Sequence, residues 1–205
     1  MWFFKKKKKK KIDWIIVGLG NPGKKYSKNR HNIGWMVAIT YAEKYKTSLL
    51  QTSSTYLEAS FTLKEKNVLI ALPITYMNNS GRALKQLVNK YNVPIENIII
   101  IVDEINFPLG KIHLKNGGGD GGHNGIASVI NELNSNQFYR LRCGIDRNFQ
   151  QGGLVDYVLS DFENEEIEAR DNMIENAVKS LDFIILNGAS KSMSFINSST
   201  LWKNS

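Results

Sequence analysis

The chain has 205 residues, of which 42% are hydrophobic and 22% charged, and its formal net charge is +8. These values are typical of one globular domain and exclude a largely disordered chain, and no apolar run approaches the roughly 20 residues that span a bilayer. The single cysteine, Cys143, excludes an intrachain disulfide and fits a reducing compartment. We interpret it as a buried strand residue rather than a nucleophile.

Positive charge is concentrated at the N-terminus. The run Lys5–Lys11 contributes seven of the eight net charges, whereas residues 161–182 hold eight acids against only Arg170 and Lys179. We expect residues 1–11 to form a basic disordered tail and residues 12–205 to form the domain. The tail is either an arm that attracts phosphate or a tract without a specific role, and the chain's general richness in Lys, Asn and Ile favours the second.

Strand and helix patterns alternate along the domain. Short apolar runs predict strands, and apolar residues at helical spacing predict helices, the first of them capped by Asn32. This order predicts an α/β fold: a single domain with a twisted, mixed, mostly parallel β-sheet flanked by helices on both faces. The predicted strands are 12–17, 56–63, 67–72, 97–102, 110–114 and 139–145, and the predicted helices are 33–46, 80–91, one that ends near 133, 162–187 and a short one near 190–196.

A glycine-rich stretch follows the first predicted strand. Residues 17–23 have the sequence VGLGNPG, which contains the G-x-G-x-x-G spacing of a dinucleotide-binding loop. Such a loop requires a helix that begins at the glycines and an acid roughly 20 residues later, at the end of a second strand. Here residues 24–30 are polar and no strand ends in an acid near residue 40. An NAD(P)-binding enzyme is therefore disfavoured, and we expect the glycines to form a tight turn that presents Asn21 in a cleft.

Two residues with acid–base chemistry lie near the ends of predicted strands. Asp103 ends the most apolar strand, where a carboxylate is costly to bury unless it is paired. His31 lies in the loop that leaves the first strand, just before a helix. Because ligands gather at the carboxyl ends of strands in α/β sheets, the two side chains together indicate a base and the carboxylate that orients it. Considered alone, His31 is more often a capping or surface histidine.

Three asparagines lie at predicted strand-to-helix transitions: Asn21, Asn78 and Asn124. An amide both donates and accepts hydrogen bonds, so converging asparagines suit recognition of a peptide-like carbonyl, whereas each alone is more often a helix cap. The sequence has no Ser in a G-x-S-x-G elbow and no clustered Cys/His ligand set, which disfavours a serine hydrolase and a zinc enzyme.

Several short motifs in a fixed order form a more specific pattern than any one of them. The chain resembles the bacterial-type peptidyl-tRNA hydrolase family over about residues 13–195. The motifs that carry the resemblance are VGLGNPG (17–23), Tyr26, RHNIG (30–34), PITYMNNSG (73–81), Asp103-Glu104, GGGDGGHNG (117–125) and RLRCGI (140–145).

The resemblance implies hydrolysis of the ester between a peptide and the 3′ ribose of tRNA, which recycles tRNA from prematurely terminated translation. The family uses no metal or cofactor and acts mainly as a monomer, so we expect a monomer whose partner is peptidyl-tRNA, with no cofactor and no membrane. By resemblance, His31 is the general base for a water and Asp103 orients it. The other site residues that the resemblance implies are Asn21, which helps place the peptide and the water; Tyr26, Met77, Asn78, His123 and Asn124, which bind substrate or the tRNA end; and Lys115 and Arg142, which hold the tRNA 5′ phosphate.

Four features depart from the usual pattern of the family. Asn106 stands where an acid is common, and we expect little effect on hydrolysis. Residues 146–148 lack the Gly and Pro that usually follow Gly144-Ile145, which leaves the conformation of that loop open. Asp120 adds negative charge near the phosphate path and should weaken tRNA binding. The lysine tail is absent from typical members.

The catalytic positions that the resemblance implies are all present, so we expect an active enzyme. The alternative from a different class is a non-catalytic RNA-binding relative of the same fold, since some relatives have become RNA-binding splicing factors. The substrate and the lack of a signal sequence predict a cytoplasmic location.

Overall fold

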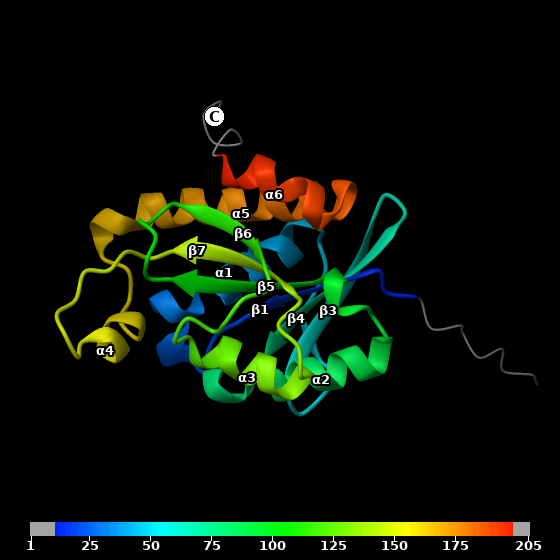
Figure 1. Ribbon diagram of the computed structural model, residues 1–205, viewed down its shortest axis with the longest axis horizontal. Coiled ribbons are helices and arrows are strands. Elements are labelled where there is room, and N and C mark those ends of the chain that lie inside the picture. The colour runs from blue at the N-terminus through cyan, green and yellow to red at the C-terminus, as the bar shows by residue number, and fades with distance from the viewer. Residues whose placement is uncertain (1–10, 199–205) are drawn as a thin grey trace, which may run out of the picture.

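The computed structural model describes residues 11–198 (Figure 1). Over this range the chain forms one seven-stranded sheet in the order β2-β3-β4-β1-β5-β7-β6. The strands are β1 (Trp14–Gly18), β2 (Leu50–Gln51), β3 (Tyr56–Leu63), β4 (Lys66–Pro73), β5 (Ile98–Glu104), β6 (Ile112–Asn116) and β7 (Tyr139–Gly144).

The centre of the sheet is parallel and its borders are antiparallel. Strand β1 pairs in parallel with β4 on one side and with β5 on the other, and β5 pairs in parallel with β7. The hairpin β3–β4 and the strand β6 add antiparallel pairs at the two sides. Strands β1 and β5 are buried along nearly their whole length, as expected for strands covered on both faces. Because β1, β5 and β7 run in parallel, the residues that follow them meet at one edge of the sheet.

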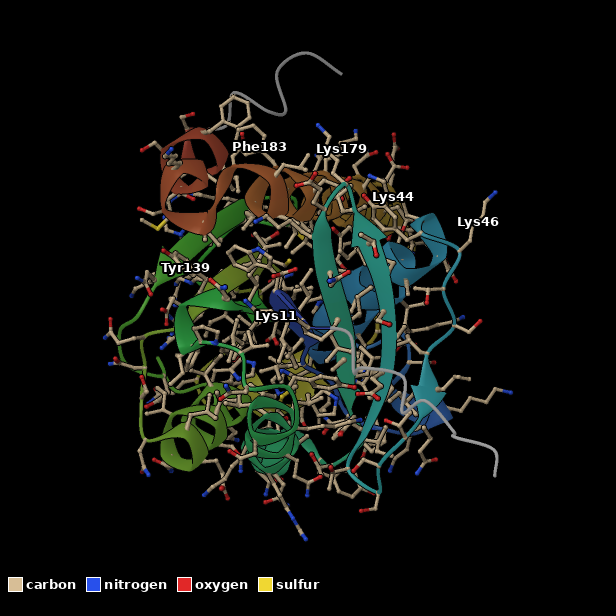
Figure 2. All side chains as sticks on the ribbon, turned by 90° about the vertical axis from the view of Figure 1, so that its right-hand side faces the viewer. Lys11, Lys44, Lys46, Tyr139, Lys179 and Phe183 are labelled. Carbon is tan, nitrogen blue, oxygen red and sulfur yellow. The ribbon has the colours of Figure 1, made fainter. Side chains whose placement is uncertain are left out.

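Helices cover both faces of the sheet, which confirms the predicted fold class. In Figure 1, α5 and α6 lie on one side of the sheet, and α2 and α3 lie on the other. Helix α1 packs against α5, and α2 packs against α3. Side chains fill the space between the sheet and both helical layers (Figure 2). The helices are α1 (Ile33–Lys44), α2 (Ser80–Tyr91), α3 (Asn124–Leu133), α4 (Leu154–Val158), α5 (Ile167–Asn187) and α6 (Ala189–Asn197).

The element boundaries differ from the sequence prediction in a few places. The long C-terminal helix begins at Ile167 rather than at residue 162, because a 3-10 turn over Asn164–Glu166 precedes it. Glu163 and Glu166 form a reciprocal capping box there, which fixes where the helix starts. The two-residue strand β2 and the five-residue helix α4 were not predicted, since elements this short carry no periodic signal.

The predicted basic tail lies almost wholly outside the described residues. Lys11 is the first residue that the structure describes, and its carbonyl accepts a hydrogen bond of 2.9 Å from Asn67 Nδ2. The boundary between tail and domain therefore stays a prediction. Among the described helices, none is long and apolar enough to cross a membrane.

Candidate active site

The glycines after β1 let α1 approach the sheet closely. A Cβ on Gly18 would collide with the backbone carbonyl of Gly34 in the first turn of α1, and a Cβ on Gly34 would collide with the carbonyl of Ile101 in β5. A Cβ on Gly20 would lie 2.5 Å from the Trp35 ring. These contacts explain why glycine is needed at these positions without a bound pyrophosphate, because atoms of the protein itself occupy the space beside each glycine. The close packing brings the 3-10 turn Arg30–Asn32, which carries His31 and precedes α1, against the end of β5.

Two asparagine side chains fix the loop that follows β1. The Asn32 side chain accepts a hydrogen bond from Asn21 N (2.9 Å) and donates one to Asn21 O (3.0 Å). The Asn21 side chain in turn accepts a hydrogen bond of 2.8 Å from Met77 N. Asn32 therefore does not cap α1 with its side chain, and that prediction is wrong, since the amide is engaged with the loop instead. Asn21 and Met77 are thereby connected to Asn32, the residue that follows His31.

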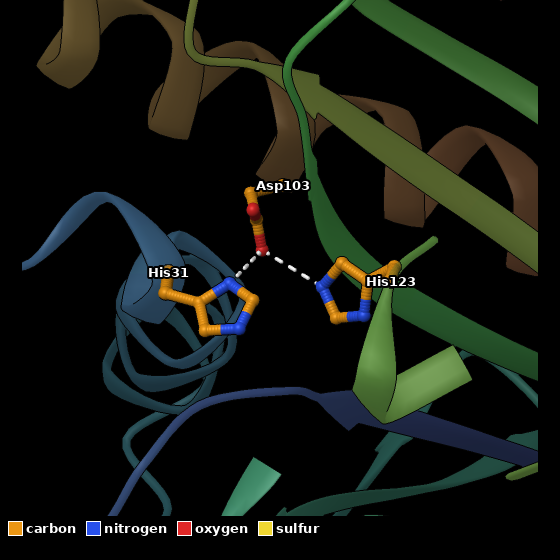
Figure 3. A group of neighbouring side chains, drawn as sticks. All are labelled: His31, Asp103 and His123. Carbon is orange, nitrogen blue, oxygen red and sulfur yellow. Dashed lines mark hydrogen bonds and ion pairs between the residues drawn. The ribbon is translucent and has the colours of Figure 1, made fainter. Parts of the chain in front are cut away.

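Asp103, the second-to-last residue of β5, accepts hydrogen bonds from two histidines (Figure 3). Its Oδ1 lies 2.9 Å from His31 Nδ1 and 3.0 Å from His123 Nε2. The two imidazole rings are tilted with their centroids 4.8 Å apart. The side chain of Asp103 is 4% exposed, and both histidine side chains are 12% exposed. One oxygen of the buried carboxylate thus pairs with two histidines, whereas the sequence predicted only the pair with His31.

The cluster changes the proton affinities of its members. Burial of His31 opposes its protonation, but the charge of Asp103 and the hydrogen bond to it outweigh burial and raise the pKa of the imidazole. Burial likewise favours the neutral form of Asp103, but the two histidines hold the pKa of its carboxyl well below the usual range. Asp103 is therefore ionised at neutral pH. His31 donates from Nδ1 to this carboxylate, which leaves its Nε2 lone pair free to accept a proton.

His123 holds Asp103 in place and also caps a helix. Its Nδ1 accepts hydrogen bonds from the backbone N–H groups of Gly125 (3.1 Å) and Ile126 (3.3 Å), at the start of α3. The ring hydrogen must therefore sit on Nε2, which donates it to Asp103. The sequence assigned His123 to substrate binding by resemblance, whereas in this arrangement both of its nitrogens are engaged within the protein.

Metal binding by the same cluster does not fit this hydrogen bonding. The ligand atoms of His31, Asp103 and His123 lie within 4.8 Å of one another, a spacing that a metal ion can use. A metal between them would replace the hydrogen on His123 Nε2, while Nδ1 still accepts from two backbone N–H groups. His123 would then have to become an imidazolate, which is unfavourable for a structural cap. The donors fit a hydrogen-bonded cluster better than a metal centre.

The cluster opens into a pocket that gathers much of the predicted site. Six of the ten predicted residues line it: His31, Asp103, Lys115, His123, Asn124 and Arg142. Asn21 and Met77 do not line it, but hydrogen bonds of the β1 loop connect them to Asn32, the residue after His31. Tyr26, in a 3-10 turn, and Asn78, in another, do not line the pocket.

Part of the pocket wall was not predicted. Arg140 is 5% exposed and donates from Nη1 to the Gly119 carbonyl (2.5 Å) and from Nη2 to the Gly118 carbonyl (2.6 Å). It thereby holds the glycine-rich loop against β7. Residues Leu154, Val155 and Val158 of α4 form an apolar side of the pocket. For Arg140, the available sequence signal was its place in the RLRCGI motif. For the apolar side formed by α4, the sequence offered no signal.

Arg30, next to His31, joins the site to α4 and α5. It is 3% exposed and donates to Ser160 Oγ (2.7 Å), to the Asp161 carbonyl (2.5 Å) and to Glu166 Oε2 (2.5 Å). Its guanidinium lies 4.5 Å from the centroid of the Tyr157 ring. The segment that carries the α4 wall is thus fastened to the residue that precedes His31.

Two of the departures from the family pattern have a local structural role. Asp120 Oδ1 accepts a hydrogen bond of 2.8 Å from Gly122 N, which stabilises the turn of the glycine-rich loop. Asp146 adopts φ 64°, a left-handed conformation that Asp tolerates better than most residues other than Gly and Asn. Its backbone N–H donates to the Phe107 carbonyl at 3.0 Å, so the chain turns there without a glycine.

The chain matches one family model and many known proteins. The model described as peptidyl-tRNA hydrolase matches residues 15–204. A peptidyl-tRNA hydrolase of Thermodesulfovibrio yellowstonii is 41% identical over 186 residues, covering 89% of this chain and 98% of that protein. One from Pediococcus pentosaceus is 42% identical over 168 residues, covering 82% and 90%.

Solved structures give the same result. The crystal structure of peptidyl-tRNA hydrolase from Acinetobacter baumannii superimposes with a TM-score of 0.85 at 32% identity, covering 91% of this chain and 95% of that one. The similarity therefore extends over most of the chain rather than over the motifs alone.

Proposed function

The chain belongs to the peptidyl-tRNA hydrolase family, and we propose that His31 and Asp103 carry out the ester hydrolysis that defines this activity. The family and the class of enzyme, a carboxylic ester hydrolase, confirm the prediction made from the motifs. The observation that carries the proposal is the hydrogen bond of 2.9 Å between His31 Nδ1 and the buried carboxylate of Asp103.

The reaction proceeds by general-base catalysis on a water. His31 Nε2 takes a proton from the water, whose oxygen attacks the ester carbonyl of the peptidyl-tRNA. The negative charge of Asp103 stabilises the imidazolium that forms. When the tetrahedral intermediate collapses, the bond from the carbonyl carbon to the ribose 3′ oxygen breaks, and that oxygen takes the proton from His31. The products are a tRNA with a free 3′ hydroxyl and a peptide carboxylic acid, which loses its proton to solvent at neutral pH.

Asparagine amides stabilise the oxyanion and place the peptide. The Asn21 side-chain oxygen accepts a hydrogen bond from Met77 N, and among residues 11–198 no hydrogen bond from its NH₂ group is found, so this group can donate to the substrate. Asn124 lies at the start of α3 on the pocket wall, where its amide can donate to the developing oxyanion. Asn78 binds the substrate farther from the pocket, with Tyr26 stacking near the tRNA 3′ end.

The basic side of the pocket receives the tRNA 5′ phosphate. Lys115 on β6 and Arg142 on β7 lie on adjacent antiparallel strands and both line the pocket. Cations held on strands provide a fixed site for a phosphate, and Arg can bind it through two donors. We infer that the chain acts as a monomer in the cytoplasm, where its substrate arises.

The test is hydrolysis of two matched substrates. One is N-acetyl-aminoacyl-tRNA, which imitates a peptide ester, and the other is the same aminoacyl-tRNA with a free α-amino group. We expect release of the amino acid from the blocked substrate only. Binding of tRNA without release from either substrate would contradict the proposal and favour the non-catalytic RNA-binding alternative.

A further inference from the structure

Glu104, the residue after Asp103, is engaged by two partners at once. Its Oε1 accepts from the backbone N–H of Asn106 (2.9 Å) and from Asn106 Nδ2 (2.8 Å). Its Oε2 accepts from Arg142 Nε (2.8 Å) and from Arg142 Nη2. The side chain of Glu104 is 13% exposed and that of Arg142 is 21% exposed. The carboxylate is therefore a bridge between a turn and the guanidinium.

Two contacts fix the guanidinium in different directions. Glu104 binds the edge formed by Nε and Nη2, and the Phe107 ring centroid lies 4.5 Å from the central carbon of the guanidinium. Among residues 11–198, no hydrogen bond from Arg142 Nη1 is found. The end of the guanidinium that carries Nη1 is thus the one available to a ligand in the pocket.

Successive residues of β5 serve the two halves of the site. Side chains alternate along a strand, so Asp103 and Glu104 point to opposite sides. Asp103 pairs in register with Cys143, and its carboxylate meets the histidines. Glu104 meets Arg142, which lies opposite Val102 in the neighbouring strand. One strand end therefore holds both the general base and the arginine in place.

We propose that Glu104, held by Asn106, is a positioning residue that orients Arg142 toward the tRNA 5′ phosphate and so sets the preference for phosphorylated substrate. This rests on the proposed phosphate site at Lys115 and Arg142. An oriented guanidinium loses less conformational entropy when phosphate binds than one that must first be ordered. Asn106 contributes because its amide donates to Glu104. An acid at this position would keep the backbone N–H donor but lose the side-chain donor, and its charge would repel the carboxylate.

Glu104 could instead compete with the phosphate for Arg142, and this role predicts the opposite effect of the same variant. A carboxylate beside Arg142 also neutralises part of its charge and competes with phosphate. If competition prevailed, Glu104→Gln would bind phosphorylated tRNA more tightly than the wild type. If orientation prevails, the same variant loses preference for the phosphate although its net charge has become more positive.

The experiment measures kcat and KM for N-acetyl-aminoacyl-tRNA with and without its 5′ phosphate. The readout is the ratio of the two kcat/KM values. We expect Glu104→Gln to lower this ratio by roughly threefold to tenfold, the size expected for the net contribution of one hydrogen bond, through a higher KM for the phosphorylated substrate. The dephosphorylated substrate serves as the reference, so a change in activity that is common to both substrates cancels in the ratio. Asn106→Asp, which leaves Glu104 in place, should lower the ratio in the same direction.

A matched control is Glu58→Gln on β3. Glu58 is 11% exposed at its side chain and forms an ion pair of 2.8 Å with Lys90, at the other side of the sheet. This variant should keep the wild-type ratio of the two kcat/KM values. The control thereby separates the effect of Glu104→Gln from the general effect of removing a buried carboxylate.

Two outcomes would overturn the proposal in distinguishable ways. In the first, Arg142→Ala abolishes the preference for phosphorylated substrate, but the ratio in Glu104→Gln and Asn106→Asp is unchanged or higher. This result would refute the positioning role and leave the phosphate site intact. An unchanged ratio in Arg142→Ala would refute the phosphate site itself and, with it, the role of Glu104. Melting temperatures of all variants establish that the comparison is made on folded protein.

Discussion

Gly18 at the end of β1 and Gly34 in the first turn of α1 approach so closely that a side chain on either would collide with backbone carbonyl groups. This contact brings α1 against β1 and β5 and thereby sets the position of His31, which lies three residues before Gly34. The glycine-rich stretch, which resembles a dinucleotide-binding loop in its spacing, therefore positions His31 through packing.

Gly18→Ala should destabilise the protein, because the added methyl group meets backbone that cannot move without shifting α1. We expect a loss of about 1–3 kcal/mol in the free energy of unfolding, as for overpacked cores, measured by urea denaturation. Gly119→Ala is the control, since a Cβ there has open space within 4 Å. Equal stability of the two variants would show that the close approach of α1 to β1 does not contribute to the free energy of unfolding.

Asp103→Asn should shift the pH dependence of hydrolysis. In the wild type, Asp103 raises the pKa of His31, and hydrolysis needs the neutral imidazole, so kcat/KM falls as the pH drops through that pKa. Without the carboxylate, burial alone lowers the pKa of His31, and the acidic limb of the profile should move to lower pH. The rate at the optimum should drop by roughly 10²–10⁴.

The control for this variant is Asp182→Asn, which removes a carboxylate that accepts hydrogen bonds from Tyr41 and Tyr45, away from the pocket. It should leave the acidic limb in place. An acidic limb that does not move in Asp103→Asn would show that another group sets the proton affinity of His31.

Cys143 should be inert toward thiol reagents in the native protein. It is fully buried on β7, and burial together with the charge of Asp103 raises the pKa of its thiol to about 12. A thiolate is the reactive form, so a disulfide reagent at pH 8 should label the thiol only after denaturation in guanidinium chloride. Rapid labelling of the folded protein would contradict the burial of Cys143 and its interpretation as a buried strand residue rather than a nucleophile.

Arg30→Met should loosen the segment that carries α4. The change removes the donors to Ser160, Asp161 and Glu166 while keeping an unbranched side chain of similar length. Because Glu166 is 24% exposed at its side chain, we expect a loss of about 2 kcal/mol rather than the larger cost of a fully buried pair. Limited proteolysis should show faster cleavage within residues 150–162.

An arginine whose ion-pair partner is exposed to solvent provides the comparison. Arg170 pairs with Asp171, whose side chain is 54% exposed, so Arg170→Met should change stability by less than about 1 kcal/mol. If the two arginine variants were cleaved at the same rate, the buried network around Arg30 would not be what fastens this segment.

The sequence was sufficient for the fold class and for part of the site. Apolar runs and helical spacing predict strands such as β5 and helices such as α2 because each pattern is local. Asp103 and His31 were predicted as a pair because both lie where strands end, and the structure brings them into hydrogen-bonding distance.

The remaining contacts depend on which strands become neighbours. Glu104 reaches Arg142 only because β5 pairs with β7, although β6 and α3 separate them in the chain. The second hydrogen bond of Asp103, from His123, depends likewise on where α3 begins. The burial of Arg30 results from long-range packing against residues 157–166. No local periodicity encodes such partners, so pattern analysis of one sequence cannot supply them.

The most direct test of the central claim is single-turnover hydrolysis of N-acetyl-aminoacyl-tRNA by His31→Ala, with tRNA binding measured on the same preparation. The variant leaves Asp103 hydrogen-bonded to His123, so the fold and the binding of tRNA should be retained. We predict that the hydrolysis rate falls by roughly 10²–10⁴ while the dissociation constant for tRNA stays within about threefold of the wild type. Hydrolysis at the wild-type rate by folded His31→Ala would show that His31 is not the general base.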